Sequence, residues 1–313
     1  MDANPTPRAP LRVAITGASG LIGSELVRQL EADGHTVLRL VRRDPRGAGE
    51  VRWDPEGGRV DAAALEGVDA VVNLAGENVG ERWTDERKRR IRASRVEGTR
   101  ALAEAVAGLA SKPNVLVNAS AVGIYGDRGD ERVDEMSAPG GGFLAGVVRD
   151  WEAATEPAAR AGIRVVMPRL GVVLTARGGA LAKMLTPFRL GAGGPMGSGT
   201  QWMSWISLDD AVDVIYLSIV DERLNGPVNT VAGAVTNEEF ARVLGRALNR
   251  PAIIPVPRFA LKLAFGQMAE EALLFSQRAE PRKLTQLGYS FAQPELEAAL
   301  RATLKEGSGV AKG

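Results

Sequence analysis

A glycine-rich turn near the amino terminus constrains the fold of this chain more than any other feature. The segment "RVAITGASGLIGSEL" (12–26) joins an apolar run to a helix-like pattern, with glycines at 17, 20 and 23. After a strand, such glycines allow a tight turn, approach of a pyrophosphate to a helix amino terminus, and close packing of helix on strand. The unpaired N–H groups and the dipole of that helix favour an anion. We therefore predict a dinucleotide site formed by Gly17, Ser19, Gly20, Leu21, Ile22 and Gly23.

Apolar segments and helix-like patterns alternate along the first half of the chain. The predicted strands are 11–16, 36–41, 50–53, 69–75, 114–120 and 163–174, and the predicted helices are 21–33, 84–107 and 143–160. This alternation is typical of a parallel sheet covered by helices on both faces. We predict an α/β fold, a Rossmann-type doubly wound parallel sheet.

After about residue 175 the sequence becomes rich in glycine, aromatic residues and proline, as in "LGAGGPMGSGTQWMSWI". Further strands are predicted near 203–206 and 227–231, and helices at 236–248, 258–275 and 294–303. We expect a Rossmann domain over 11–175, with sheet elements returning near 203–232, and a smaller C-terminal α/β substrate-binding cap over 176–305. Residues 1–10 and 306–313 are predicted to be flexible tails.

Charge balance and composition exclude several kinds of partner and chemistry. Lys and Arg number 39 against 38 Asp and Glu, a net charge of +1, so no global field attracts nucleic acid or anionic lipid. Cysteine is absent and His35 is the only histidine, which we expect at the surface at a strand start; thiolate catalysis, a histidine-centred triad and a metal site are therefore not expected. No apolar run approaches about 18 residues, and the proline-rich start lacks a signal-peptide core. We expect a cytoplasmic protein with no nucleic-acid and no membrane partner.

The end of the second predicted strand indicates which dinucleotide binds. A site for NAD usually places an acid there for the ribose 2′-hydroxyl, whereas this strand ends Val41-Arg42-Arg43. Two guanidinium groups suit a 2′-phosphate, although a solvated basic turn is the alternative and the adjacent Asp44 counts against the assignment. We predict NADP(H).

At the end of the fourth predicted strand, the small residues Ala75 and Gly76 would let a ribose or adenine lie against the backbone.

Several stretches together resemble the extended short-chain dehydrogenase/reductase family of the epimerase/dehydratase type. They are TGASGLIG (16–23), DAVVNLAG (69–76), RVEGT (95–99), SAVGIYG (120–126), and GSGTQ followed by WISLDD (197–210). Others, including "GENVGERW", "RDWEAA", "GGALAKML" and "GPVNTVAG", are similar to an atypical branch labelled "epimerase family protein". The resemblance implies NADP(H) as cofactor, a possible homodimer, and a cofactor site lined by Arg42, Arg43, Leu74, Ala75 and Arg95. We expect this site to include Gly76, Glu77, Ala119 and Arg169 as well.

The catalytic pattern of that family is missing. Its members use a Tyr-x-x-x-Lys pair with a serine or threonine, but the residues four places after the three tyrosines are Gly129, Val220 and Gln293. By position, Phe143 and Val147 replace the tyrosine and the lysine.

Two hydroxyl groups are candidate substitutes. Tyr125 could reach the nicotinamide, or it could be a packed aromatic with a satisfied hydroxyl. Ser120 could donate to a substrate carbonyl, or it could bond to the backbone at a strand end. Glu77 is the nearest candidate acid or base. Arg169 either frames the nicotinamide or an anionic substrate, or it forms a structural salt bridge.

The expected substrate pocket is apolar and aromatic. In nucleotide-sugar enzymes of the family an arginine follows the GxGxQ stretch by two places, whereas here Gln201 is followed by Trp202 and Met203. A nucleotide diphosphate would find its charge poorly matched, so we expect a smaller, less charged substrate. The predicted pocket residues are Phe143, Gln201, Trp202 and Trp205, with a core role for both tryptophans as the alternative.

Two functions remain open from the sequence. One is an NADP(H)-dependent oxidoreductase or epimerase-like enzyme acting on a small hydroxyl or carbonyl compound, favoured by the retained cofactor and pocket motifs. The other is a catalytically silent NADP(H)-binding sensor, favoured by the vacant catalytic positions.

Overall fold

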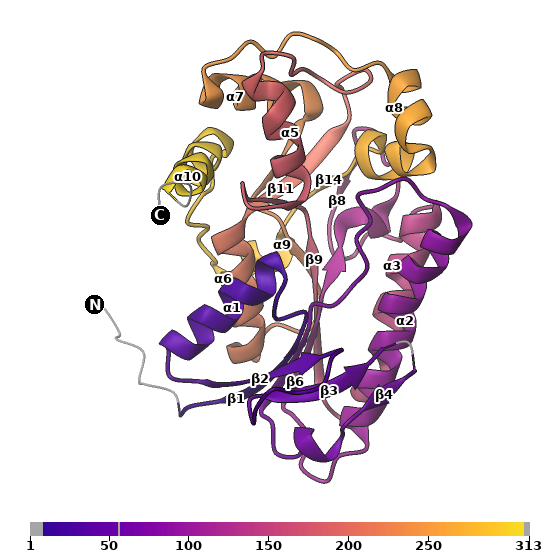
Figure 1. Ribbon diagram of the computed structural model, residues 1–313, viewed down its shortest axis with the longest axis vertical. Helices are drawn as coiled ribbons and strands as arrows, with labels where there is room; N and C mark the ends of the chain where they lie inside the picture. The colour runs from indigo at the N-terminus through magenta and orange to yellow at the C-terminus, as the bar shows by residue number, and fades with distance from the viewer. Residues whose placement is uncertain (1–8, 56, 310–313) are drawn as a thin grey trace.

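A computed structural model describes residues 9–55 and 57–309, and the side chains of all of these except 306–309. A nine-stranded sheet with the order β12-β9-β6-β5-β1-β2-β3-β4, and β7 beside β9, forms its centre (Figure 1). Every pairing in it is parallel except β3 with β4. The strands are β1 (Arg12–Thr16), β2 (Thr36–Val41), β3 (Glu50–Asp54), β4 (Arg59–Val60), β5 (Ala70–Asn73), β6 (Val115–Asn118), β7 (Ser120–Ala121), β9 (Arg164–Leu170) and β12 (Gly226–Thr230). The predicted doubly wound parallel sheet is confirmed.

Helices cover both faces of this sheet, which is why its central strands are apolar along their whole length. Helices α1 (Leu21–Ala32) and α6 (Leu208–Val220) lie on one face, and α2 (Asp85–Ala107), α3 (Phe143–Ala153) and α4 (Glu156–Arg160) lie on the other (Figure 1). Leu26 and Ile215 belong to the first core cluster and Leu102 to the second, and all three are fully buried. Each such side chain stabilises the fold by about 1.5–3 kcal/mol relative to its exposed state.

The strand order places a ligand site at one edge of the sheet. Strands β2 and β5 lie on either side of β1, so the order reverses between β1 and β5. In open α/β sheets, ligands bind at the carboxyl ends of the strands at such a reversal. The glycine-rich turn follows β1 directly, so the sequence places it at this point.

A second, smaller sheet and the helices packed on it form the cap. Its three-stranded sheet has the order β10-β11-β13, built from β10 (Val172–Leu174), β11 (Trp202–Ser207) and β13 (Gly233–Thr236). Helices α5 (Gly179–Arg189), α7 (Asn237–Leu248) and α10 (Leu296–Gly309) pack around it, with Leu181, Phe240 and Leu300 fully buried among them. The remaining elements are α8 (Arg258–Phe265), the π-helical turn η3 (Ala269–Leu274), α9 (Arg282–Leu287), the pair β8 (Arg132–Val133) and β14 (Arg278–Ala279), and the 3-10 turns η1 (Ala63–Leu65) and η2 (Val122–Tyr125).

Several predicted boundaries are wrong for identifiable reasons. The predicted strand 163–174 divides at Gly171, where a Cβ would lie 2.7 Å from the carbonyl oxygen of Ser204, because β11 passes there and takes β10 into the cap sheet. The predicted helix 258–275 ends at Gly266, whose φ of +62° stops α8. The helix α6 was not predicted, because "LDDAVDVIYLSIV" is apolar on most sides and lacks a clear helical period. Helices α5 and α9 were also not predicted.

Two further expectations also need correction. Of the sheet elements expected to return near 203–232, β12 joins the main sheet, whereas β11 belongs to the cap sheet. Helix α10 continues to Gly309, past the predicted start of the C-terminal tail at 306; residues 1–8 and 310–313 of the predicted tails lie outside the described residues.

His35 is structural but not at the surface. It is 8% exposed, its Nδ1 accepts from the backbone N–H of Leu11 at 3.0 Å, and its Nε2 lies 3.1 Å from the Tyr216 hydroxyl. None of the helices among the described residues has the length and apolar character that crossing a membrane requires.

Candidate dinucleotide site

The turn between β1 and α1 has the geometry that its three glycines predict. Gly17 has a φ of +69°, and a Cβ there would lie 2.8 Å from the carbonyl carbon of Leu74. A Cβ on Gly23 would lie 2.2 Å from the carbonyl oxygen of Gly17, so α1 can approach the turn only with glycine at this position. Gly20 is the N-cap of α1 without a capping side chain, and the first helical turn contains no acidic residue. The first N–H groups of α1 are thus left for an anion.

Buried polar side chains hold the end of β5 beside this turn. The Thr16 hydroxyl lies 2.5 Å from Asn73 Oδ1 and accepts from the backbone N–H groups of Leu74 and Ala75 at 3.1 and 3.2 Å. The Asn73 amide donates to Thr99 Oγ1 and to Asn118 Oδ1 at 2.8 and 2.7 Å, which ties β5 to α2 and β6. Ala119 is buried, and its N–H donates to the Asn73 carbonyl at 2.9 Å. The loop that contains Leu74, Ala75 and Gly76 therefore has a fixed position against β1.

The two arginines at the end of β2 differ in their surroundings. Arg43 Nη1 donates to Glu50 Oε2 at 2.7 Å, and its Nη2 bonds to the other oxygen of Glu50. This contact and the backbone N–H of Arg46 lower the pKa of Glu50 to about 2. Asp44 pairs with Arg52 at 2.6 Å. Arg42 is exposed and has no hydrogen-bond or ion-pair partner among the residues that the structure describes, so its guanidinium is available to a ligand.

Arg95 lies directly behind the β5 loop. Its Nη1 donates to the Glu77 carbonyl at 2.9 Å, its guanidinium stacks 5.2 Å from the Trp151 ring centre, and a Cβ on Gly76 would lie 3.0 Å from its Cζ. Burial lowers the pKa of Arg95 to about 10, although the charge of Glu77 opposes the shift. The Glu77 carboxylate is partly exposed and lies 3.5 Å from an Arg87 nitrogen. Arg95 therefore supports the loop on which a ribose would rest.

The hydroxyls of Tyr125 and Ser120 are both bonded to other groups of the protein. The Tyr125 side chain is fully buried, and its hydroxyl lies 2.6 Å from Asn229 Oδ1 and 2.9 Å from the Asp134 carbonyl while accepting from Arg169 Nη1 at 3.0 Å. Burial raises the pKa of this hydroxyl, although Arg169 opposes the rise. Ser120 is 2% exposed and donates to Glu152 Oε1 at 2.6 Å. Both hydroxyls have partners inside the protein, which agrees with the packed alternative for Tyr125, and their contact with substrate stays a prediction.

Arg169 forms the structural salt bridge that was the alternative to a cofactor role. Its Nε and Nη2 donate to the two oxygens of Glu152, each at 2.8 Å, and the two side chains are 7% and 12% exposed. We call Ser120, Tyr125, Glu152, Arg169 and Asn229 the Glu152–Arg169 network. It joins β7, β9 and β12 to α3, and a contact of Arg169 with the nicotinamide stays a prediction.

The predicted substrate pocket is only partly available to a ligand. The Gln201 amide donates to the backbone carbonyls of Met196 and Leu273, and Trp205 is 2% exposed within the cap core, so both serve the cap itself. Phe143 is half-buried and packs edge-to-face on Trp83 at 5.2 Å.

Trp202 is the other half-buried member of the predicted pocket. Its Nε1 donates to Asp130 at 2.9 Å, and the Arg278 guanidinium lies 3.9 Å from its ring centre. Phe143 and Trp202 are therefore the pocket residues that the structure leaves accessible.

Two carboxylates with structural roles, Glu152 and the buried Glu271, were not identified from the sequence. Glu152 lies in "RDWEAA", a stretch that was noted only for its family resemblance. Glu271, on η3, accepts from the backbone N–H groups of Phe143 and Leu144 at 3.1 and 2.8 Å and so caps α3. No local pattern indicates this cap, because the carboxylate and the helix lie 128 residues apart in sequence.

Comparison with known proteins agrees with this geometry. The model of the NAD dependent epimerase/dehydratase family matches residues 13–230, and that of a domain of unknown function, DUF1731, matches residues 256–303. This chain belongs to the NAD dependent epimerase/dehydratase family. Both the family and its atypical branch were expected from the motifs quoted above, and both are confirmed.

Relatives of this family member cover almost its whole length. It is 48% identical over 292 residues to the epimerase family protein Mb2239 of Mycobacterium bovis, covering 92% of this chain and 96% of that protein. A crystal structure of the human epimerase family protein SDR39U1 with NADPH is 37% identical, with a TM-score of 0.86 over 94% of this chain and 99% of that one. A UDP-glucuronic acid 4-epimerase from Bacillus cereus, at 17% identity and a TM-score of 0.75 over 97% of this chain and 98% of that one, shares the fold alone.

Proposed function

We propose that this family member binds NADP(H) across the β1–β5 reversal of its sheet and acts as an oxidoreductase on a small carbonyl or hydroxyl compound. The uncapped start of α1, together with the unpaired Arg42 at the end of β2, is the observation that carries the proposal. The human relative crystallised with NADPH supports it.

The residues present fit this cofactor. The glycine turn offers backbone N–H groups to the pyrophosphate, and Arg42 offers a fork of donors to the 2′-phosphate, where an NAD site would carry an acid. Ala75 and Gly76 present backbone to the ribose, with Arg95 packed behind them. When bound, the nicotinamide supplies or accepts the hydride.

The chain's own contribution is to orient and enclose the reacting groups. Phe143 begins α3 at the position that the family gives to a tyrosine, and Glu271 fixes that helix start through two backbone N–H groups. A phenyl ring excludes water but donates no proton, so the proton that accompanies the hydride would come from solvent or from Glu77, the nearest candidate acid or base. Gln201 is held by backbone carbonyls, and Met203 occupies the position at which nucleotide-sugar members carry an arginine, which favours a substrate less charged than a nucleotide sugar.

A second candidate function is an NADP(H)-binding sensor that does not convert a substrate. The burial of the Ser120 and Tyr125 hydroxyls favours it, because neither is free to take part in a reaction. The two functions differ in a direct assay that follows the reduced-nicotinamide absorbance while aldehydes, ketones and hydroxy compounds are screened. The oxidoreductase is expected to oxidise NADPH with at least one carbonyl compound, and turnover should survive Tyr125→Phe. Absence of turnover, with a partner protein captured in only one cofactor redox state, would establish the sensor instead.

Removing the Arg42 guanidinium should weaken NADPH binding selectively. A hydrogen bond to a charged group contributes about 1.5–3 kcal/mol, so Arg42→Ala should raise the Kd of NADPH by about 10- to 100-fold and leave that of NADH unchanged. Arg43→Ala is the matched control, because Arg43 is already bound to Glu50, and its effect should be several-fold smaller. Isothermal titration of both nucleotides measures this. Equal effects of the two substitutions would contradict the assignment of Arg42.

A further inference from the structure

Exposed apolar side chains concentrate at one end of the molecule. Eight large apolar residues are exposed among those described, and six of them belong to the cap. We call these six the cap-end patch: Leu190, Ile253, Ile254, Phe259, Leu263 and Phe265. Exposed apolar residues scattered singly need no explanation, but a cluster marks a surface that contacts something.

The helix α8 presents an unpartnered apolar face. Its sequence is RFALKLAF, in which Leu261 is buried, whereas Phe259 and Leu263 are 73% and 77% exposed. Residues four apart lie on the same side of a helix, so these two side chains project together. The segment 250–266 that contains them, "RPAIIPVPRFALKLAFG", has three basic residues and no Asp or Glu.

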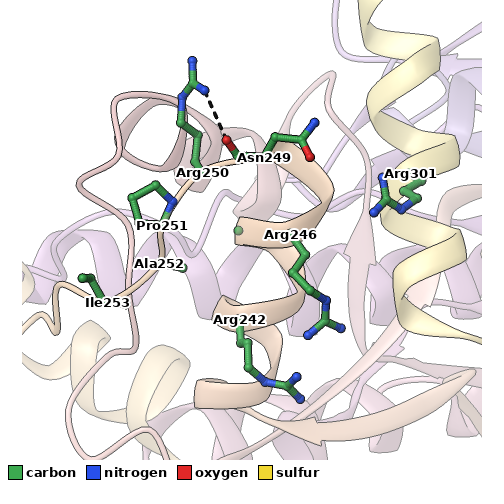
Figure 2. Close-up of a pocket in the computed structure, with 9 residues that line it drawn as sticks. Arg242, Arg246, Asn249, Arg250, Pro251, Ala252, Ile253 and Arg301 are labelled. Carbon is green, nitrogen blue, oxygen red and sulfur yellow. Dashed lines mark hydrogen bonds between the residues drawn. The ribbon is translucent and has the colours of Figure 1, made fainter.

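A basic depression adjoins the patch. It has a volume of about 620 Å³ and is lined by Arg242, Arg246, Arg250 and Arg301, with Ile253 of the patch also in its wall. Figure 2 shows Arg301 on α10 pointing toward α7, while Arg250 extends away from both helices.

In the ion pairs at this end, three carboxylates serve five basic side chains. Glu239, Glu270 and Glu297 are shared among five basic side chains there: Arg242, Arg246, Arg258, Lys262 and Arg301. Arg250 pairs with no carboxylate in the described part of the chain and donates to backbone carbonyls instead.

Ile253 belongs both to the patch and to the wall of the depression, so the loop before α8 connects the two. Arg250 Nε donates to the Arg189 carbonyl at 3.0 Å, and the Ile254 N–H donates to the Gly193 carbonyl at 3.1 Å, which holds the loop before α8 against the end of α5. This loop and α8 lie together at the cap end of the long axis (Figure 1).

We propose that the cap end docks on an anionic membrane surface. Phenylalanine, leucine and isoleucine side chains enter the boundary between headgroups and acyl chains, and the basic side chains attract the anionic headgroups. Arg258 and Lys262 share the single carboxylate of Glu270, and Arg250 pairs with none among the described residues, so positive charge in excess lies beside the apolar side chains and complements an anionic headgroup surface. From the net charge of +1 we expected no membrane partner. A net charge near zero does not show that basic side chains gather at the cap end.

Sedimentation of the full chain with lipid vesicles tests the proposal. The protein should bind vesicles of equimolar phosphatidylcholine and phosphatidylglycerol, bind less as salt rises, and not bind phosphatidylcholine alone. The double variant Phe259→Ser with Leu263→Ser should weaken binding at least about tenfold, and Arg250→Gln with Lys262→Gln about 30-fold. All four positions are solvent-accessible, so unchanged thermal unfolding midpoints should confirm that the variants fold.

Matched controls lie elsewhere on the surface. Met136→Ser removes an apolar side chain that is 78% exposed, and Arg160→Gln removes a cation whose side chain is 76% exposed; neither should change vesicle binding. Failure to bind anionic vesicles, or equal effects of patch and control variants, would overturn the proposal. If the protein is a dimer in solution and the double variant Phe259→Ser with Leu263→Ser is a monomer, the patch binds a second copy of the chain instead. If inorganic phosphate abolishes vesicle binding at constant ionic strength, the depression binds a free anion rather than a lipid headgroup.

Discussion

Glu152→Ala is expected to lower the free energy of unfolding by about 3–5 kcal/mol, because it leaves the Arg169 guanidinium buried without its counter-charge. The pair is formed by two hydrogen bonds of 2.8 Å and is nearly enclosed. Ser120 Oγ would lose its acceptor as well. Glu152→Gln should lose less, since an amide keeps one acceptor for Arg169. Chemical denaturation of the three proteins measures the differences.

The exposed pair between Arg160 and Glu156 is the matched control. Its distance of 2.7 Å is similar, but its side chains are 76% and 54% exposed. Solvent screens such a pair, so Glu156→Ala should cost less than about 1 kcal/mol. If Glu152→Ala and Glu156→Ala destabilise the chain equally, the network does not hold β7 and β9 to α3 in the way described here.

Gly23→Ala should disrupt the candidate dinucleotide site. The added Cβ would lie 2.2 Å from the Gly17 carbonyl oxygen, which is backbone and cannot turn aside, so α1 must move away from the turn. Overpacking of this kind costs about 1–3 kcal/mol of stability. If the N–H groups of α1 bind the pyrophosphate, the Kd of NADPH should also rise at least about tenfold. Titration calorimetry and denaturation together measure both effects.

Gly146→Ala controls for the substitution itself. Gly146 lies within α3, and no atom would lie within 4 Å of its Cβ. Alanine is favoured over glycine in a helix interior by about 0.5–1 kcal/mol, so this variant should be as stable as the parent or slightly more so. NADPH binding that is equally strong in the two variants would show that the close approach of Gly23 has no bearing on the site.

The sequence was sufficient for those features that depend on neighbouring residues. The glycine turn, its strand and its helix are contiguous, so their spacing alone predicts the close contacts seen at Gly17 and Gly23. The long helix α2 was predicted within one residue at its start, where the structure shows a local cap: the Thr84 side chain accepts from the N–H of Arg87, and the acidic Asp85 and Glu86 follow. The glycine turn and the start of α2 both depend on residues that are close together in the sequence.

Features that depend on distant contacts could not be predicted. Whether Arg42 or Arg43 is free depends on Glu50, which the pairing of β2 with β3 brings alongside. The sequence left open whether Tyr125 is accessible or packed, because its hydroxyl partner Asn229 lies on a strand 104 residues later. The Glu271 cap of α3 likewise forms only in the folded chain.

Titration of the wild-type protein with NADPH and NADH, by calorimetry, tests most directly whether the β1–α1 turn and Arg42 form an NADP(H) site. Saturable binding of NADPH is expected at one site per chain, with NADH bound at least about tenfold more weakly for lack of the phosphate contact. Absence of binding by both NADPH and NADP⁺, or equal affinity for NADPH and NADH, would contradict this assignment.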